Sequence, residues 1–385
     1  MVLYFATEAR FVKRNGLYYS LGGFSGELLK RYLKHFDSVT VIARVTEDST
    51  INVDESMLAT VPGVNYIELP YYIGLFGYLK NQRVIRNILS KSLPLDAQYI
   101  CRLPGQVGGE VIRYLQKYNI PYSCEVVGNP WDVFAKGSVN HPLRPLIRYI
   151  STRRLKAQVY ASKACLYVTK TTLQKIYPVK PTSFSVGVSD VIIADKVLAS
   201  IPKIHTSKEQ YTLISVGSME QMYKAPDVVL TAMSILKNKG FNLRLVWLGD
   251  GKFKEEMQSL AKELELTVEF KGNVSSDKVH ANIDQSDMFI LVSRTEGLPR
   301  AIVEAMAHGI PCIGSRVGGI PELLDDAALV DKENPEQLAD LIERFITDHN
   351  FYNNQAVRNL NEASFYKEEK LDALRNTFFS YIKQQ

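Results

Sequence analysis

Short apolar stretches alternate with helical patterns throughout the second half of the chain. Residues 211–216 are apolar and β-branched, residues 226–236 repeat their apolar side chains with a helical period, and residues 243–248 form the next apolar stretch. The alternation continues to about residue 345. Strands that alternate with helices in this way favour a parallel sheet covered by helices on both faces.

The first half repeats this alternation less regularly, with helical stretches such as 27–35 and 84–89. At 385 residues, the chain is longer than one hydrophobic core usually supports. We therefore predict an α/β fold with two Rossmann-like, doubly wound parallel-sheet domains, residues 1–190 and 191–367. Their strand ends would face a cleft, where ligands of such sheets bind. The strands expected in the first domain are residues 2–6, 39–43, 66–69, 98–101, 122–127 and 165–168.

The four cysteines stand singly in or beside apolar stretches, and none of their spacings suits a metal site. We therefore expect buried thiols and no bound metal. No apolar run approaches the roughly 18–20 residues that span a bilayer, and no basic segment precedes the first strand. These features predict a cytoplasmic protein.

Basic residues are concentrated in the first half. Residues 1–190 carry 24 Lys and Arg against 13 Asp and Glu, a net charge of +11, whereas the remainder carries −6. This balance suits an anionic partner, either the inner face of a membrane or an acceptor that carries phosphate. Residues 142–163 mix Arg and Lys with large apolar side chains, and residues 70–80 mix aromatics with glycine. Peripheral membrane contact and an ordinary core-facing amphipathic helix explain the basic stretch equally well.

The stretch from Glu296 to Glu304 has the pattern of an anion-binding site. It follows an apolar run at 288–292, turns at Gly297 and enters a helix at Pro299, so free backbone N–H groups point to one place. Glu296 lies before the helix and Glu304 within it. Because carboxylates repel phosphate, we expect both to accept hydrogen bonds from hydroxyls of an attached sugar or ribose. Two solvated glutamates on an ordinary strand and helix are the alternative.

The spacing of these glutamates, the Gly-Leu-Pro between them and the continuation Ala305-Met-Ala-His-Gly-Ile-Pro311 resemble the retaining nucleotide-sugar glycosyltransferases of family 4. That family has two Rossmann domains in the architecture called GT-B. The resemblance is strongest over about residues 211–330 and weaker through the first half. It implies that the last helix, within residues 368–385, crosses back to pack on the first domain.

The resemblance also implies roles for residues of the second domain. Glu304 would accept hydrogen bonds from both ribose hydroxyls, Glu296 from hydroxyls of the donor sugar, and Lys224 would hold the diphosphate. Family members usually carry Arg where this chain has Ser218, so Arg300 or another cation would complete the diphosphate site, or the diphosphate would bind more weakly. The other donor contacts that the resemblance implies are Gly217, Gly272, Asn273, Val274, Gly297, Leu298, Pro299 and Ala301.

The first domain offers weaker candidates. Gly22 and Gly23 precede the first helix, where glycine lets the backbone approach donor phosphates or the acceptor, although a simple turn has the same sequence. Family members often have His in the loop after the fifth strand, and this chain has none there. Asn129 and Asp132 are therefore the candidates to contact the donor sugar or the acceptor hydroxyl. A structural turn explains this Asn-Pro-Trp-Asp sequence equally well.

These features predict a retaining glycosyltransferase. It would move a sugar from a UDP-sugar or GDP-sugar to a hydroxyl of a glycan or lipid-linked acceptor in the synthesis of a cell-surface polysaccharide. Glu296, Lys224 and Asp132 would be the catalytic residues. No metal would take part, because no strand-end loop has an Asp-x-Asp pair. We also expect no cofactor and no nucleic-acid partner. A phosphorylase or epimerase of the same fold, and a non-catalytic subunit that binds nucleotide sugar, are the alternatives.

Overall fold

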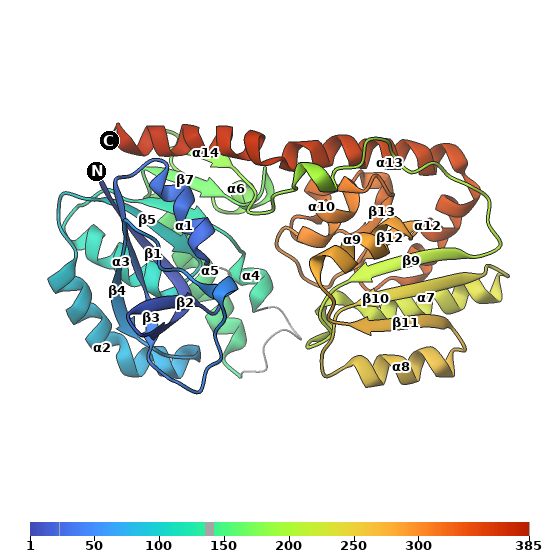
Figure 1. The fold of residues 1–385 in the computed structure, drawn as a ribbon, viewed down its shortest axis with the longest axis horizontal. Helices are drawn as coiled ribbons and strands as arrows, with labels where there is room; N and C mark the ends of the chain where they lie inside the picture. Colours follow the sequence, from blue (N-terminus) through green and yellow to red (C-terminus); the bar gives the residue numbers. More distant parts are fainter. Residues whose placement is uncertain (23, 135–141, 385) are drawn as a thin grey trace.

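The structure is a computed structural model that describes residues 1–22, 24–134 and 142–384. Two β-sheets, one from each half of the chain, lie side by side (Figure 1), and each carries helices on both faces. Apart from the antiparallel pairing of β1 with β2, all strand pairs within the two sheets are parallel. The predicted architecture of two doubly wound α/β units is therefore confirmed.

The first sheet has eight strands. The short strand β2 (Leu17–Ser20) pairs with β1, and the other seven lie in the order β4-β3-β1-β5-β6-β7-β8. Strand order reverses beside β1, because β3 lies on one side of it and β5 on the other. The bounds of these seven strands are β4 (Val64–Pro70), β3 (Ser38–Thr46), β1 (Val2–Arg14), β5 (Gln98–Leu103), β6 (Ser123–Val126), β7 (Ala164–Tyr167) and β8 (Phe184–Gly187).

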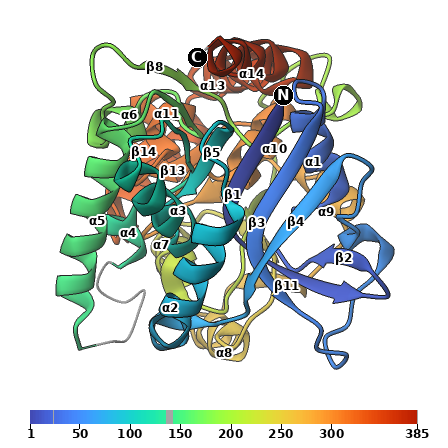
Figure 2. The same ribbon diagram turned by 90° about the vertical axis from the view of Figure 1, so that its left-hand side faces the viewer.

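Helices cover both faces of the first sheet. One face packs against α2 (Gly74–Ser92), α3 (Gln106–Lys117), α5 (Arg144–Tyr160) and α6 (Thr172–Ile176). The other packs against α1 (Gly26–Leu33) and the last helix α14 (Glu368–Lys383), whose Phe378 and Phe379 are buried there. Figure 2 shows α2, α3 and α5 on one side of the strands and α1 on the other.

The second sheet has six strands in the order β11-β10-β9-β12-β13-β14. Its strand order reverses between β9 and β12, which are neighbours although two strands separate them in the chain. Buried apolar residues fill all four positions of β12 and five of the six positions of β10. In β9, three apolar residues and Ser215 are buried. The bounds are β9 (Tyr211–Val216), β10 (Leu243–Leu248), β11 (Thr267–Gly272), β12 (Met288–Leu291), β13 (Cys312–Ser315) and β14 (Leu329–Val330).

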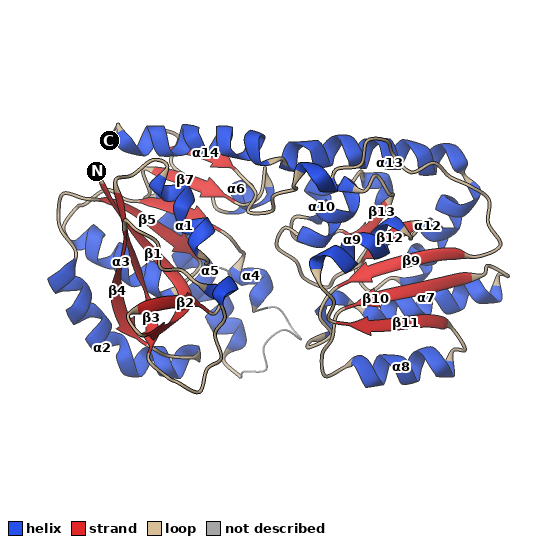
Figure 3. Cartoon of the chain, in the orientation of Figure 1, coloured by secondary structure: helices blue, strands red, loops and turns tan. Residues whose placement is uncertain are grey.

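The helices of the second half also form two layers (Figure 3). The hydrophobic core on one face includes α7 (Pro226–Asn238), α8 (Lys254–Glu263) and α12 (Pro335–Thr347). The core on the other face includes α9 (Ser276–Asp284), α10 (Arg300–Ala307) and α11 (Ile320–Leu323). Helix α13 (His349–Ala363) contributes residues to both cores.

Two connections and a set of polar contacts join the halves. The chain passes from β8 to β9 through residues 188–210, and α13 leads back to α14 along the top of the view in Figure 1. The carboxylate of Glu322 in α11 accepts hydrogen bonds from the N–H groups of Lys170 (2.6 Å), Thr171 (3.1 Å) and Thr172 at the start of α6. Lys170 also pairs with Glu362 of α13. Glu322 therefore satisfies backbone donors at a helix end in the opposite half.

Two other expectations concerned buried cysteine thiols and the lack of an apolar segment long enough to span a bilayer. Cys101, Cys124, Cys165 and Cys312 are all buried and unpaired. Within the described residues, no helix is both long enough and apolar enough to span a bilayer.

Candidate functional site

The loops after β9 and β12 meet where the strand order of the second sheet reverses. Strand β9 ends at Val216 and leads through Gly217 to Lys224, while β12 ends at Leu291 and leads to Glu296. In open α/β sheets, ligands bind beyond the carboxyl ends of the strands at such a reversal. The topology therefore brings together two segments that the sequence analysis singled out separately.

Lys224 and Glu296 form an ion pair at this place. The Lys224 ammonium donates a hydrogen bond to Oε1 of Glu296, and the two side chains are only 14% and 10% exposed. The ammonium also lies 5.3 Å from the centre of the Tyr223 ring. Burial, and after it the charge of Glu296, raise the pKa of the Tyr223 hydroxyl. A cation that can hold phosphate and a carboxylate that can accept sugar hydroxyls therefore stand in direct contact.

Two glycines allow the loops to approach this closely. A Cβ on Gly217 would lie 2.9 Å from Cγ of Lys224, so a side chain there would displace the lysine. Gly318 has φ of +54°, and a Cβ on it would lie 2.0 Å from the carbonyl oxygen of Glu296. The N–H of Gly319 donates to the carbonyl of Gly297 at 2.6 Å. The turn at Gly318 and Gly319 therefore packs directly against the loop that carries Glu296.

Arg294 holds the turn that carries Lys224, and the sequence analysis missed it. Its guanidinium donates to the carbonyl of Met222 at 2.6 Å, and its backbone N–H donates to the carbonyl of Tyr223 at 2.7 Å. The guanidinium also binds both carboxylate oxygens of Asp227 at 3.0 and 2.7 Å. Asp227 therefore offsets the charge of Arg294, while Arg294 holds the turn through the carbonyls of Met222 and Tyr223.

Glu304 lies on α10 and is half-buried. Burial raises the pKa of its carboxyl, and the charges of Arg300 and His280 oppose that rise. Arg300 is one turn earlier, with its Nε 3.6 Å from Oε1 of Glu304. His280 exchanges a hydrogen bond with His308 at 2.9 Å between Nδ1 and Nε2. The guanidinium of Arg300 thus lies beside Glu304. Its role as a cation that binds the diphosphate stays a prediction.

The predicted donor-contact loop of Gly272, Asn273 and Val274 adjoins the loop after β9. Gly272 ends β11 with φ of +66°, and a Cβ on it would lie 3.0 Å from Oδ2 of Asp250. Ser218 donates from its hydroxyl to the carbonyl of Asp250 at 3.1 Å. The predicted contacts Ser218 and Gly272 therefore both lie beside Asp250, and Gly217 precedes Ser218 in the chain. The backbone contacts Leu298, Pro299 and Ala301 lie at the start of α10.

The first-half candidates have mixed outcomes. Asn129 caps the short helix α4 (Pro130–Val133): its Oδ1 accepts from the N–H of Trp131 at 3.0 Å, and its Nδ2 donates to Asp132 at 2.7 Å. These contacts favour the structural-turn interpretation of Asn129. Burial raises the pKa of Asp132, opposed by the Asn129 hydrogen bond and by charges that include Lys332 from the opposite half. Asp132 is therefore within electrostatic reach of the second half. Gly22 lines a cavity, whereas Gly23 lies outside the described residues.

The second half of the chain matches a known family. Residues 199–361 match the family described as glycosyl transferases group 1. These residues form a glycosyltransferase group 1 domain. Protein CapJ of Staphylococcus aureus is 28% identical over 386 residues, which cover 97% of this chain and 94% of CapJ. The O-antigen biosynthesis glycosyltransferase WbnH of Escherichia coli is 27% identical over 176 residues, 45% of this chain and 49% of WbnH.

Solved structures share the complete two-domain arrangement. Sucrose-phosphate synthase from Thermosynechococcus elongatus matches with a TM-score of 0.71 at 15% identity, over 100% of this chain and 99% of that one. HepE of Anabaena in complex with UDP-glucose matches with a TM-score of 0.62 at 13% identity, over 100% and 98%. These similarities confirm the GT-B fold that the sequence predicted.

Proposed function

We propose that this chain is a retaining glycosyltransferase that moves a sugar from a nucleotide-diphosphate sugar to a hydroxyl of a glycan or lipid-linked acceptor. The observation that carries the proposal is the contact between Lys224 and Glu296 at the strand-order reversal of the group 1 domain, with Glu304 on the adjoining helix. The UDP-glucose complex of HepE supports a UDP-sugar, with a GDP-sugar as the other donor to test. The name of WbnH supports a role in cell-surface polysaccharide synthesis.

In the proposed reaction, Lys224 and the backbone N–H groups at the start of α10 stabilise negative charge on the departing diphosphate. Glu296 and Glu304 accept hydrogen bonds from sugar and ribose hydroxyls. The bond between the anomeric carbon and the phosphate oxygen breaks, and the acceptor oxygen bonds to that carbon on the same face. The acceptor proton passes to the departing phosphate oxygen. No cofactor or metal is proposed, and full turnover in excess chelator is the expected result.

The test has two stages. Thermal unfolding with UDP-glucose, UDP-galactose and GDP-mannose identifies the donor, because a ligand at 100 times its dissociation constant adds about 2.7 kcal/mol to the free energy of unfolding. Release of nucleoside diphosphate is then measured with and without polysaccharide fragments as acceptors, and NMR determines the anomeric configuration of the product. Acceptor-dependent release with retention is expected. Turnover that needs free phosphate, or isomerised donor without an acceptor, would instead identify a phosphorylase or an epimerase.

We further propose that the surface of the first half formed by α2 and α5 rests on an anionic membrane. Helices α2 and α5 contain nine Lys and Arg and no Asp or Glu. Both pack against α3: Arg154 of α5 donates to Gln106 at 3.0 Å, and Arg86 of α2 pairs with Glu110 at 2.7 Å. Figure 2 shows the two helices on the same side of the first half.

Exposed apolar side chains accompany these charges. Ile73 is 68% exposed at the start of α2, and Leu146 and Ile150 of α5 are also exposed. A basic surface with exposed apolar side chains suits the interface of an anionic bilayer. Within the described residues, Arg153 donates a hydrogen bond to the Tyr149 hydroxyl at 3.4 Å and forms no ion pair with a carboxylate. This surface would place the protein where lipid-linked acceptors are found.

A further inference from the structure

A cavity of about 260 Å³ lies where the strand order of the first sheet reverses, beside β1 and β5. Its lining includes Glu8 and Arg10 from β1, Gly22 and Phe24 from the loop before α1, and Arg102 from β5. This is the position in the first sheet that corresponds to the Lys224 and Glu296 site in the second. Ligands of open α/β sheets bind at such positions, yet the sequence analysis named only Gly22 from this lining.

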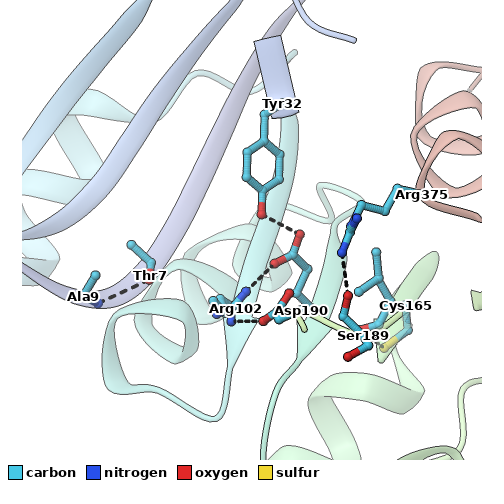
Figure 4. A network of polar contacts seen from close by, with 10 residues as sticks. Thr7, Ala9, Tyr32, Arg102, Cys165, Ser189, Asp190 and Arg375 are labelled. Atoms are coloured by element: carbon cyan, nitrogen blue, oxygen red, sulfur yellow. Dashed lines mark hydrogen bonds and ion pairs between the residues drawn. The ribbon is translucent and has the colours of Figure 1, made fainter. Parts of the chain in front are cut away.

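A β-bulge in β1 forms one wall. Ala6 pairs with Ile42 and Arg10 pairs with Arg44, so three residues of β1 oppose one residue of β3. The hydroxyl oxygen of Thr7 accepts from the N–H of Ala9 at 3.2 Å within the bulge, as Figure 4 shows. Bulges redirect side chains and are common beside functional sites. Here the bulge directs consecutive residues of β1 to the cavity.

Glu8 is held in a fixed position with capacity to spare. Its carboxylate accepts from the hydroxyl of Tyr72 at 2.9 Å and from the N–H of Val107 at 2.9 Å, and Arg44 lies 3.4 Å from Oε1. The side chain is still 33% exposed. A carboxylate has about four acceptor positions, so Glu8 can also accept a hydrogen bond from a hydroxyl in the cavity.

Arg102 is a wall residue whose charge is already matched. It binds Glu125 at 3.0 Å and Asp190 at 2.5 Å, and Tyr32 donates to Glu125 at 2.8 Å (Figure 4). Its guanidinium also lies 5.0 Å from the centre of the Phe24 ring. Two carboxylates therefore offset this cation, and Arg102 adds no free positive charge to the cavity.

Arg10 has a different environment. Its one hydrogen bond to a side chain within the described residues is to the hydroxyl of Tyr71, at the long distance of 3.5 Å, and no carboxylate in that part of the chain lies within ion-pair distance. With Glu8 offset by Arg44 and Arg102 offset by Glu125 and Asp190, the charge of Arg10 is the one left unmatched in the lining. Guanidinium groups in such positions bind carboxylate or phosphate in bidentate fashion.

We propose that this cavity binds one sugar ring that carries an anionic group, with Arg10 holding the anion and Glu8 accepting from a ring hydroxyl. The volume is below the roughly 300–1,000 Å³ of pockets for drug-sized ligands, which suits a single ring. The inference deepens the proposed function, on which it rests, because this ring would belong to the acceptor. The anion is a carboxylate, as in a hexuronate, or a phosphate, as in a hexose phosphate.

Saturation-transfer NMR and calorimetry with small probes test the proposal. The probes are methyl glucuronide, glucose 6-phosphate, methyl glucoside and inorganic phosphate. The wild type is expected to bind one of the two anionic sugars at least tenfold more tightly than methyl glucoside or phosphate alone. R10Q should lose that preference. R113Q, which removes an exposed arginine from α3, should keep it. The stronger anionic probe distinguishes hexuronate from hexose phosphate.

Equal binding of charged and neutral sugars, binding of phosphate alone, or no sugar binding would overturn the proposal. UDP affinity provides a separate reading. R10Q should bind UDP within twofold of the wild type, and an equal loss of UDP binding would assign Arg10 to the donor diphosphate and overturn the acceptor role. If the anionic sugar binds through Arg10 but no donor turns over, the transferase proposal fails while the sugar site stands.

Discussion

Lys224 and Glu296, 72 positions apart in the chain, neutralise each other at the one point where strand order reverses in the second sheet. Their side chains are largely withdrawn from water. Under the proposed function, the Lys224 ammonium binds the diphosphate of the donor and the Glu296 carboxylate binds its sugar hydroxyls. Replacing either side chain is therefore expected to change both the stability of the protein and its affinity for the donor, and both effects can be measured.

Replacing Lys224 by Met should lower the free energy of unfolding by about 1–3 kcal/mol, because Glu296 would keep a poorly hydrated charge without its partner. The double variant K224M/E296Q should recover part of that loss. Urea unfolding of the wild type, both single variants and the double variant gives the coupling energy. Effects that add to within about 0.5 kcal/mol would show that the two side chains do not interact in solution.

Glu304→Gln should show how burial of the Glu304 carboxyl affects the free energy of unfolding. Burial raises the pKa of Glu304 in the folded protein above its ordinary value of 4.5, so the folded state holds a proton more tightly than the unfolded state. Its contribution is then fully present at low pH and is lost as pH rises through the folded pKa. The variant should match or exceed the wild type in stability at pH 7, with the difference vanishing below the unfolded pKa. A variant less stable than the wild type at pH 7 contradicts this account.

The same residue is assigned to the ribose. Glu304→Ala should weaken UDP or GDP binding by about 1.5–3 kcal/mol, the usual worth of hydrogen bonds to a charged group. Glu296→Ala should instead abolish turnover while the free diphosphate still binds, because Glu296 is assigned to the donor sugar. Calorimetry on both variants checks the division of roles, which is wrong if Glu304→Ala changes affinity less than twofold.

Arg294→Gln should weaken UDP binding about tenfold, although Arg294 is not proposed to touch the donor. It acts by holding the carbonyls of Met222 and Tyr223, which fix the turn that carries Lys224. In a K224M background the substitution should therefore have little further effect on UDP affinity. A tenfold loss in both backgrounds would show that Arg294 acts independently of Lys224.

The sequence predicted the second sheet closely and the first less well. Residues 211–216 and 243–248 are strands with the expected ends, because each is an apolar run closed by polar residues or glycine. Helix α2 begins at Gly74, ten residues before the helix expected at 84, because Leu75 and Leu79 are exposed and break the inward apolar period. Helix α13 was not predicted, since its asparagines mask the helical pattern.

The site shows the same division. The resemblance singled out Glu296, Glu304 and Lys224 from the sequence, and the structure places Lys224 and Glu296 in contact, while their roles stay predictions. The hydrogen bonds of Arg294 and the cavity beside Arg10 could not be predicted from the sequence. Each depends on strand order or on a bulge that no local sequence pattern reveals. Residues that act through long-range packing leave little signal in a single sequence.

The membrane surface of α2 and α5 gives the last prediction. Each exposed Lys or Arg near an anionic bilayer contributes roughly 1 kcal/mol, so four of them account for weak, reversible binding that salt should release. Changing four exposed basic residues to Gln should abolish sedimentation with acidic liposomes at low ionic strength. The control replaces four exposed lysines outside these helices, removing equal charge. The test set is Lys80, Arg83, Arg153 and Lys156, and the control set is Lys252, Lys262, Lys278 and Lys370.

The test set is preferred to Arg144, Arg148 and Arg154, which also make contacts within the protein. Arg148, for example, lies 3.8 Å from the centre of the Trp131 ring, and Arg154 binds Gln106. Activity on a lipid-linked acceptor should fall in the test variant more than donor hydrolysis does, since only the acceptor requires the membrane. The control should keep both. Equal loss of liposome binding in the two variants would mean that net charge alone drives association, and a wild type that ignores acidic liposomes at low salt would make this face an ordinary solvated surface with a soluble acceptor.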